Sequence, residues 1–151
     1  LIRFNEDHAE QEMPFFGQDI FLEAESRGDL TSSEYREALD LCRRATRDDG
    51  IDKVLDMHRL DAIVAPTGGP AWTTDLVNGD HFLGGSSSFA AVSGYPNITV
   101  PAGHVHGLPI GISFFGRAWS EPQLLQLAFA FAAAPQARRA PEGKPAGRRW
   151  V

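Results

Sequence analysis

Phe82-Leu83-Gly84-Gly85-Ser86-Ser87-Ser88-Phe89-Ala90-Ala91-Val92-Ser93-Gly94-Tyr95-Pro96-Asn97-Ile98-Thr99-Val100-Pro101 is the stretch around which the rest of this 151-residue sequence is organised. It begins with a turn of small residues and continues as a short buried helix over 86–93. Gly94 can end that helix in a left-handed conformation, and Pro96 prevents its continuation. The residues that follow predict a short apolar strand over 97–100.

Two further apolar segments flank this stretch and complete a predicted three-stranded sheet. The first, over 61–66, is apolar without alternation, which is typical of a strand covered on both faces. The second, over 110–115, should alternate its side chains between the two faces. The connection over 102–107 is too short for a parallel crossover, so an antiparallel turn is expected there. Strands that alternate with helices predict an α/β layer with a mixed sheet. Because few segments remain to cover them, we expect the strands to belong to a larger sheet.

The N-terminal part is predicted to be irregular over 3–16 and helical over 18–27 and 32–48. The segment Thr31-Ser32-Ser33-Glu34 has the spacing of a capping box, which places the cap at Thr31. The apolar residues of the second helix recur every three to four positions and predict one buried face, with Cys42 in the core. These residues are Tyr35, Ala38, Leu39, Cys42 and Ala45.

Three features near the other predicted helix ends set further expectations. Gly50 is a natural residue to end the helix over 32–48, and a short helix should lead from Val54 to Leu60. Ser120 is a candidate cap for a last helix with Pro122 in its first turn. That helix is apolar over much of its surface, so we expect it to be largely buried.

The charge of the chain is negative and unevenly distributed. The formal net charge is −6, yet the segment 135–151 carries five basic residues against Glu142 alone. An acidic body argues against a nucleic-acid groove, which needs clustered Lys and Arg. No apolar run reaches the length of a membrane-spanning helix. The single Cys42 excludes an internal disulfide and fits a cytoplasmic location.

The expected organisation is one domain over 1–134 followed by a basic tail over 135–151. Pro and Gly recur through the tail and predict disorder there. The chain begins with Leu1 and lacks a signal-peptide pattern, so we expect it to be a piece of a longer protein.

The Gly/Ser turn over 84–88 admits more than one interpretation. Free N–H groups at the start of a helix can bind an anion or polarise a carbonyl, which would fit a non-catalytic anion or small-molecule binding module. The alternative is a structural serine cap with glycines for close packing. A self-contained serine hydrolase would use Ser86, Ser87 or Ser88, but the chain has no Gly-x-Ser-x-Gly elbow.

Other candidate groups are weaker. His104 and His106 could place two imidazoles on one side of an extended segment, but the sequence offers no further zinc ligands. A solvated turn is the expected structure there. Trp72 lies on a Gly/Pro loop and could either cover a pocket or anchor in the core.

Four blocks of sequence, in order and spacing, resemble the C-terminal third of an amidase signature family enzyme. They are LDAIVAPT (60–67), GGSS (84–87), AVSGYPNITVPAG (91–103) and GLPIGISFFG (107–116). The resemblance implies that the fold is the C-terminal part of a large mixed-sheet α/β/α domain, and that the parent enzyme hydrolyses a carboxylic amide.

The resemblance also implies how chemistry is divided within that parent. Family members use a nucleophilic serine, a second serine on a cis peptide and a buried lysine, with no metal or organic cofactor. Those residues lie N-terminal to everything in this sequence, so no catalytic role is carried over to any residue here. The partners implied are a small-molecule amide substrate and the N-terminal part of the same enzyme, while assembly into a homo-oligomer is left open.

The part of the site expected in this chain is a wall of the acyl pocket. Glutamine-using relatives carry an acidic side chain near the start of the Gly/Ser block, whereas this chain has only glycine and serine there. That difference favours a neutral or apolar acyl group. The expected wall residues are Trp72, Gly84, Gly85, Ser86 and Trp119.

Overall fold

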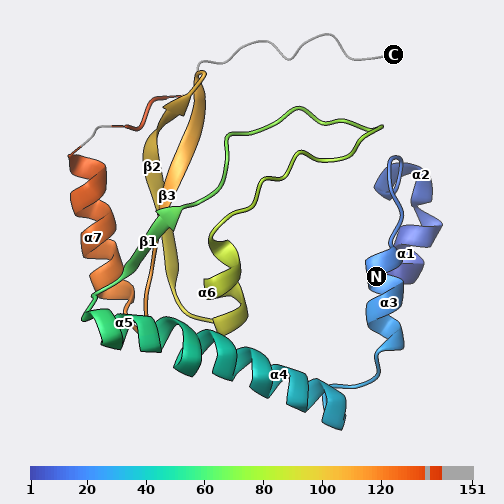
Figure 1. Cartoon of the computed structure of the whole chain (residues 1–151). Helices are drawn as coiled ribbons and strands as arrows, with labels where there is room; N and C mark the ends of the chain where they lie inside the picture. The colour runs from blue at the N-terminus through green and yellow to red at the C-terminus, as the bar shows by residue number, and fades with distance from the viewer. Residues whose placement is uncertain (135–136, 141–151) are drawn as a thin grey trace.

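The computed structural model describes residues 1–134 and 137–140 and shows a small sheet between helices (Figure 1). One helix packs on one face of the sheet, and two shorter helices pack on the other. The strands are β1 (Ile63–Pro66), β2 (Asn97–Val105) and β3 (Leu108–Phe115), and the helices that cover them are α5 (Asp52–His58), α6 (Ser87–Ser93) and α7 (Glu121–Ala133).

The sheet has the order β1-β3-β2, with β3 antiparallel to both neighbours. The predicted antiparallel connection is confirmed, but it is tighter than expected. His106 and Gly107 form the turn at φ values of 50° and 80°, so β2 continues to Val105. The pairing of β2 with β3 shifts register between Pro101 and Gly103, so the longer β2 strand is irregular at this point. The α/β layer is confirmed, and within this segment the strand pairs are antiparallel.

Alternation along β3 separates the two packed faces as predicted. Phe115 is buried beside Phe89 of α6, with ring centroids 6.2 Å apart. Phe114 points to the opposite face and meets Phe131 of α7 edge-on at 5.9 Å. The core proper lies on the Phe115 side and consists of Ile51, Leu55, Ala90 and Phe115.

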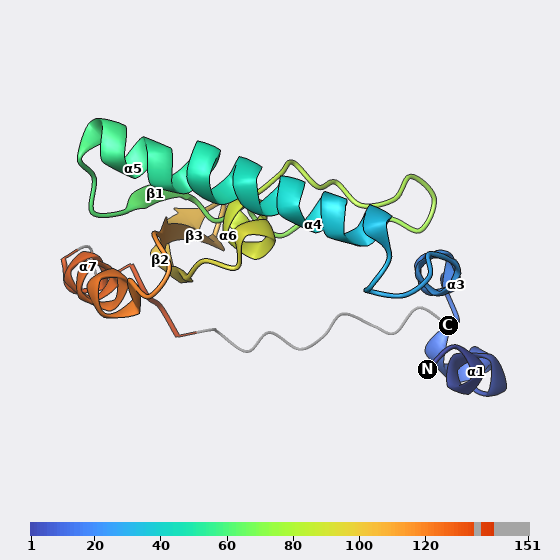
Figure 2. The same ribbon diagram turned by 90° about the horizontal axis from the view of Figure 1, so that it is seen from below.

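A long helical segment runs along one side of the sheet (Figures 1 and 2). It consists of α4 (Ser33–Thr46) and α5 (Asp52–His58), which are joined through a kink in the segment η1 (Arg47–Ile51). Gly50 was expected to end the first helix, and this prediction is confirmed, since its backbone has non-helical angles of φ −108° and ψ −106°. Its backbone is kinked, and a Cβ there would lie 2.7 Å from the Ala45 carbonyl oxygen. Gly50 therefore ends the first helix and permits the kink from which the next helix begins.

Ser32, rather than the predicted Thr31, caps α4. The Ser32 hydroxyl accepts a hydrogen bond from the Tyr35 N–H at 3.2 Å, whereas Thr31 hydrogen-bonds to Asp29. The two hydroxyl residues are adjacent, so the sequence spacing alone could not separate them.

We expect Ser32→Ala to lower the free energy of unfolding by about 1 kcal/mol, because an orphan N–H of the first turn loses its partner. Urea denaturation followed by circular dichroism measures this change. Thr31→Ala is the matched control and should have the smaller effect. Equal losses for the two variants would contradict the assignment of the cap.

The N-terminal segment is helical where irregular chain was expected over 3–16. α1 (Ile2–Asp7) and α2 (Ala9–Glu12) precede α3 (Asp19–Ser26) at the end of α4 remote from the sheet (Figure 1). Gln18 joins this part together, since it accepts from the Asn5 side chain at 3.1 Å and donates to the Ile2 carbonyl at 3.2 Å. The residues before Pro14 include good helix formers, and that local propensity outweighs their polarity.

Two predicted burials are wrong for one common reason. Cys42 is exposed, although it lies on the apolar side of α4. α7 buries Leu124 and Ala128, but Phe129 on its other side is 78% exposed. Each helix packs against the described chain along only part of its apolar surface. A helix that is apolar on several sides needs cover on each of them.

Tyr95 ties the long helix to the corner between α6 and β2. Its hydroxyl donates to the Asp52 carboxylate at 2.6 Å, and Arg117 lies 3.8 Å from the same carboxylate. Arg47 lies over the Tyr95 ring at 5.4 Å and donates to the Ser93 carbonyl at 2.7 Å. Partial burial and the neighbouring Asp52 raise the pKa of Tyr95 to about 12.

This geometry predicts that Tyr95→Phe is destabilising, by about 1.5–3 kcal/mol for a hydrogen bond to a charged group. The folded chain holds the phenolic proton to higher pH than the unfolded chain, so the contribution is complete below about pH 10. It declines as pH rises toward the folded pKa of about 12. Urea unfolding of the unsubstituted chain and of Tyr95→Phe at pH 8 and pH 11 tests this prediction. A difference in unfolding free energy between the two proteins that is larger at pH 11 than at pH 8 would refute it.

Candidate functional site

The end of β1 and the start of α6 meet at the Gly/Ser turn. Gly68 and Gly85 form an isolated antiparallel bridge, and the Ser86 N–H donates to the Thr67 carbonyl at 3.2 Å. A Cβ on Gly85 would lie 2.7 Å from that carbonyl oxygen, so only glycine permits this approach. Gly84 has a φ of 98°, a conformation that glycine adopts without strain. The structure thus packs the turn of Gly84, Gly85 and Ser86 directly against the backbone of Thr67.

Ser86 is the residue directly before α6 (Ser87–Ser93). Its side chain is 6% exposed, and its hydroxyl has no hydrogen-bond partner among the described residues. Nor does it cap α6 through its side chain. A buried hydroxyl without a partner carries a free-energy cost, which makes Ser86 a group that is ready to accept or donate a hydrogen bond.

The two alternative functions of this turn find no support here. In residues 1–134 and 137–140, no hydrogen bond joins Ser86, Ser87 or Ser88 to a histidine or a carboxylate, as an activated serine would need. For the anion-site hypothesis, the cation Arg47 is engaged at the opposite end of α6, where it donates to the Ser93 carbonyl. Both hypotheses remain untested predictions.

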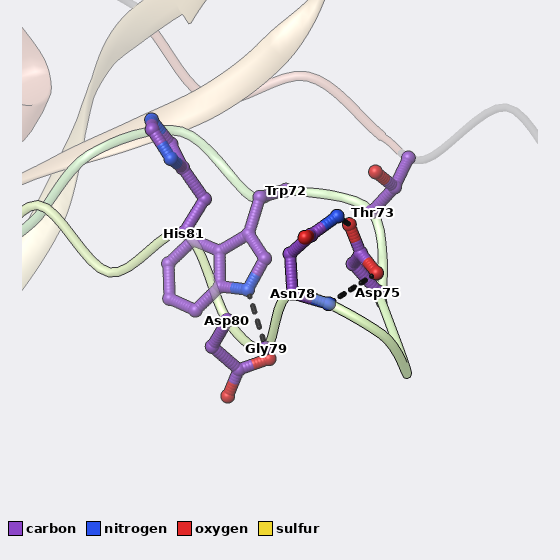
Figure 3. Close-up of a pocket in the computed structure, with 7 residues that line it drawn as sticks. All are labelled: Trp72, Thr73, Asp75, Asn78, Gly79, Asp80 and His81. Carbon is purple, nitrogen blue, oxygen red and sulfur yellow. Dashed lines mark hydrogen bonds between the residues drawn. The ribbon is translucent and has the colours of Figure 1, made fainter.

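Trp72 lies in the long loop between β1 and α6 (Figure 3). Its indole N–H donates to Asp80 at 3.3 Å, and its ring meets Phe82 edge-on at 6.0 Å. The side chain is 41% exposed, so it is not an anchor in the core. It helps line a hollow of about 420 Å³ within this loop, together with Thr73, Asp75, Asn78, Gly79, Asp80 and His81.

Asp75 holds the tip of this loop in a turn. It accepts hydrogen bonds from the backbone N–H and the side-chain amide of Asn78 and from the Val77 N–H. These bonds hold the pKa of Asp75 below its usual range, the two from Asn78 first. The carboxylate is therefore occupied within the loop, which indicates a structural role.

Trp119 is not brought together with the other expected wall residues. It adjoins Gly94, Tyr95 and Pro96, at the end of α6 opposite to Ser86. Its φ of 65° is unusual for a bulky residue, and its side chain is 89% exposed. The hollow of about 230 Å³ that it lines is distinct from the Gly/Ser turn.

The described residues hold neither a cluster of potential metal ligands nor a helix able to span a membrane. His106 lies in the exposed hairpin turn, as expected, but the solvated turn predicted for His104 is wrong, because His104 lies within β2 and is half-buried. The predicted tail over 135–151 falls largely outside the described residues.

This fold and the block order place the chain in a known family. The family model for amidases matches residues 4–125, which is most of the chain, so the chain belongs to the amidase family.

Individual relatives show that this chain corresponds to only part of them. A probable amidase of Arabidopsis thaliana is 39% identical over 144 residues, which is 94% of this chain and 25% of that protein. A putative amidase of Schizosaccharomyces pombe is 32% identical over 73% of this chain and 18% of that protein.

Solved structures of peptide amidases likewise match this chain over only part of their own length. A complex with the competitive inhibitor chymostatin has a TM-score of 0.88 and 46% identity, over 94% of this chain and 29% of that chain. The native peptide amidase of Stenotrophomonas maltophilia has a TM-score of 0.83 and 45% identity, over 93% of this chain and 28% of that chain. The chain therefore spans about a quarter of the length of the relatives it matches.

Proposed function

We propose that this chain is the C-terminal portion of an amidase that hydrolyses a carboxylic amide to an acid and an amine or ammonia. The N-terminal portion would supply the nucleophilic serine, the second serine on a cis peptide and the lysine. This chain would supply a wall of the acyl pocket at Gly84, Gly85 and Ser86. The observation that carries the proposal is the family match together with an amidase fold that covers only a quarter of each relative.

The chemistry of the wall supports a neutral or apolar acyl group. The turn presents two glycines and a serine, so it offers no charge to pair with a charged substrate. Trp72, on the loop that leads into the turn, would extend the wall with an aromatic surface. Trp119 would contribute from the other end of α6, in a separate part of the pocket. The lone Cys42 supports a cytoplasmic location.

The test is reconstitution from two parts. This chain is co-expressed with the N-terminal part of the Stenotrophomonas maltophilia peptide amidase, ending where the matched segment begins. Release of ammonia from a peptide amide with an apolar C-terminal residue is then measured. We expect activity from the assembly and none from either part alone.

Two controls sharpen this experiment. An N-terminal part whose nucleophilic serine is changed to alanine should abolish the activity of the assembly. An otherwise identical substrate with an acidic residue in place of the apolar one should be a poorer substrate. Hydrolysis by this chain alone, after rigorous purification, would overturn the proposal and favour an autonomous serine hydrolase.

A further inference from the structure

Three hydroxyl groups, one from each strand region, form a partly buried cluster next to the Gly/Ser turn, with Ser113 buried, Thr67 half-buried and Thr99 exposed. Ser113 in β3 is fully buried, and its Oγ lies 2.8 Å from the Thr67 Oγ1 and 2.9 Å from the Thr99 Oγ1. The Thr67 and Thr99 hydroxyls are themselves 3.3 Å apart. Each hydroxyl can donate once and accept from its neighbours, so the three can satisfy one another.

Gly111 makes room for this cluster. A Cβ at Gly111 would lie 2.8 Å from the Thr99 methyl group and 2.9 Å from the Thr67 hydroxyl. Gly111 also accepts a hydrogen bond from the Thr67 N–H at 2.9 Å. The sheet thus holds Thr67 by both its backbone and its side chain.

Thr67 in turn holds the wall. Its carbonyl accepts from the Ser86 N–H, and the Gly85 backbone packs directly on that carbonyl oxygen. All the polar groups of Thr67 are therefore engaged, its N–H and hydroxyl by the sheet and its carbonyl by the turn. A displacement of Thr67 would move the turn that carries the unpartnered Ser86 hydroxyl.

We propose that Thr67, fixed by the hydroxyls of Ser113 and Thr99, is the positioning residue that sets the place of the Gly84–Gly85–Ser86 wall. This inference rests on the proposed function for its catalytic consequence. Thr67 acts through the turn and does not itself touch substrate. Its loss should weaken binding of the acyl group in the ground state and the transition state alike, which raises KM and leaves kcat nearly unchanged.

The variants separate the hydroxyl from the shape of the side chain. Thr67→Val keeps the shape and removes the hydroxyl, whereas Thr67→Ser keeps the hydroxyl. In the two-part assembly, we expect Thr67→Val to raise KM about tenfold with kcat within about twofold, and Thr67→Ser to restore KM to within about twofold. Ser32→Ala serves as a destabilising control outside the site and should leave KM unchanged.

Amide hydrogen exchange provides a second readout that needs no activity. The Ser86 N–H should exchange about tenfold faster in Thr67→Val than in the unsubstituted chain, with normal protection in Thr67→Ser. If the assembly is inactive, the proposed function fails and the exchange result alone decides the positioning role. If Thr67→Val does not fold, Ser113→Ala, which removes the central hydroxyl, takes its place.

Two results would overturn the positioning role. One is that Thr67→Val, or Ser113→Ala in its place, leaves both KM and Ser86 exchange unchanged. The other is that Thr67→Ser is as impaired as Thr67→Val, since the hydroxyl would then be irrelevant.

Discussion

Gly85→Ala is expected to raise KM of the two-part assembly at least tenfold. The added Cβ would lie 2.7 Å from the Thr67 carbonyl oxygen, a backbone atom that cannot rotate away. The turn would have to separate from the end of β1, and the Ser86 N–H would lose its hydrogen bond to Thr67. Displacements of about 1 Å at a binding site can reduce enzyme efficiency by about a hundredfold. Steady-state kinetics with the peptide amide substrate measures the effect.

Gly69→Ala is the matched control for this variant. Gly69 lies on the same loop system, but a Cβ there would have no neighbour within 4 Å. We expect its KM to remain within about twofold of the unsubstituted assembly. An equal rise in KM for Gly85→Ala and Gly69→Ala would contradict this explanation. It would mean that KM depends on the flexibility of glycine in the loop and not on the close backbone contact at Gly85.

Gly111→Ala is expected to lower the free energy of unfolding by about 1–3 kcal/mol, the usual cost of overpacking a filled site. The new methyl group would meet the Thr99 methyl group at 2.8 Å and the Thr67 hydroxyl at 2.9 Å. Since Gly111 lies on a central strand, neither neighbour can move without disturbing the hydroxyl cluster. Urea denaturation of the chain measures this loss.

A second substitution can relieve half of this clash. Thr99→Ser keeps the hydroxyl and removes the methyl group that the new side chain would meet, so Gly111→Ala combined with Thr99→Ser should recover part of the lost stability. The contact with Thr67 would remain. A double variant no more stable than Gly111→Ala would show that the cluster does not respond as a packed unit.

The sequence predicted the sheet and its immediate surroundings well, because local signals there agree with one another. The hairpin followed from the short connection over 102–107, and Gly94 ends α6 at a φ of 72°. The two faces of β3 followed from simple alternation. At Gly50 the local signal was also reliable, because the helical geometry is interrupted there, at φ −108° and ψ −106°.

Burial was predicted less well than secondary structure. Cys42 and Phe129 lie on apolar surfaces that a sequence pattern marks as buried, yet both are exposed in the described chain. The pattern reports that a surface needs cover and does not say which segment covers it. In the proposed function, that cover comes from the N-terminal portion of the amidase.

The wall itself stays a prediction. Gly84, Gly85 and Ser86 were singled out by composition and by the resemblance, and the structure packs their turn against Thr67. The Thr67–Ser113–Thr99 cluster was missed, because its members lie far apart in sequence and meet only through strand register. The threonine that ends the LDAIVAPT block was the one available signal. Trp119 lies apart because α6 separates it from the turn.

The most direct test of the central claim, that this chain is one part of a larger amidase, uses Cys42 as a reporter. It is the only cysteine in the sequence and is exposed on the apolar side of α4. Its alkylation rate is measured by mass spectrometry of the Cys42 peptide, with and without the N-terminal part of the peptide amidase. We predict rapid labelling of the chain alone and at least tenfold protection in the assembly, as expected when an apolar face becomes buried in an interface. Equal labelling in both samples, with no association between the two parts, would contradict the account.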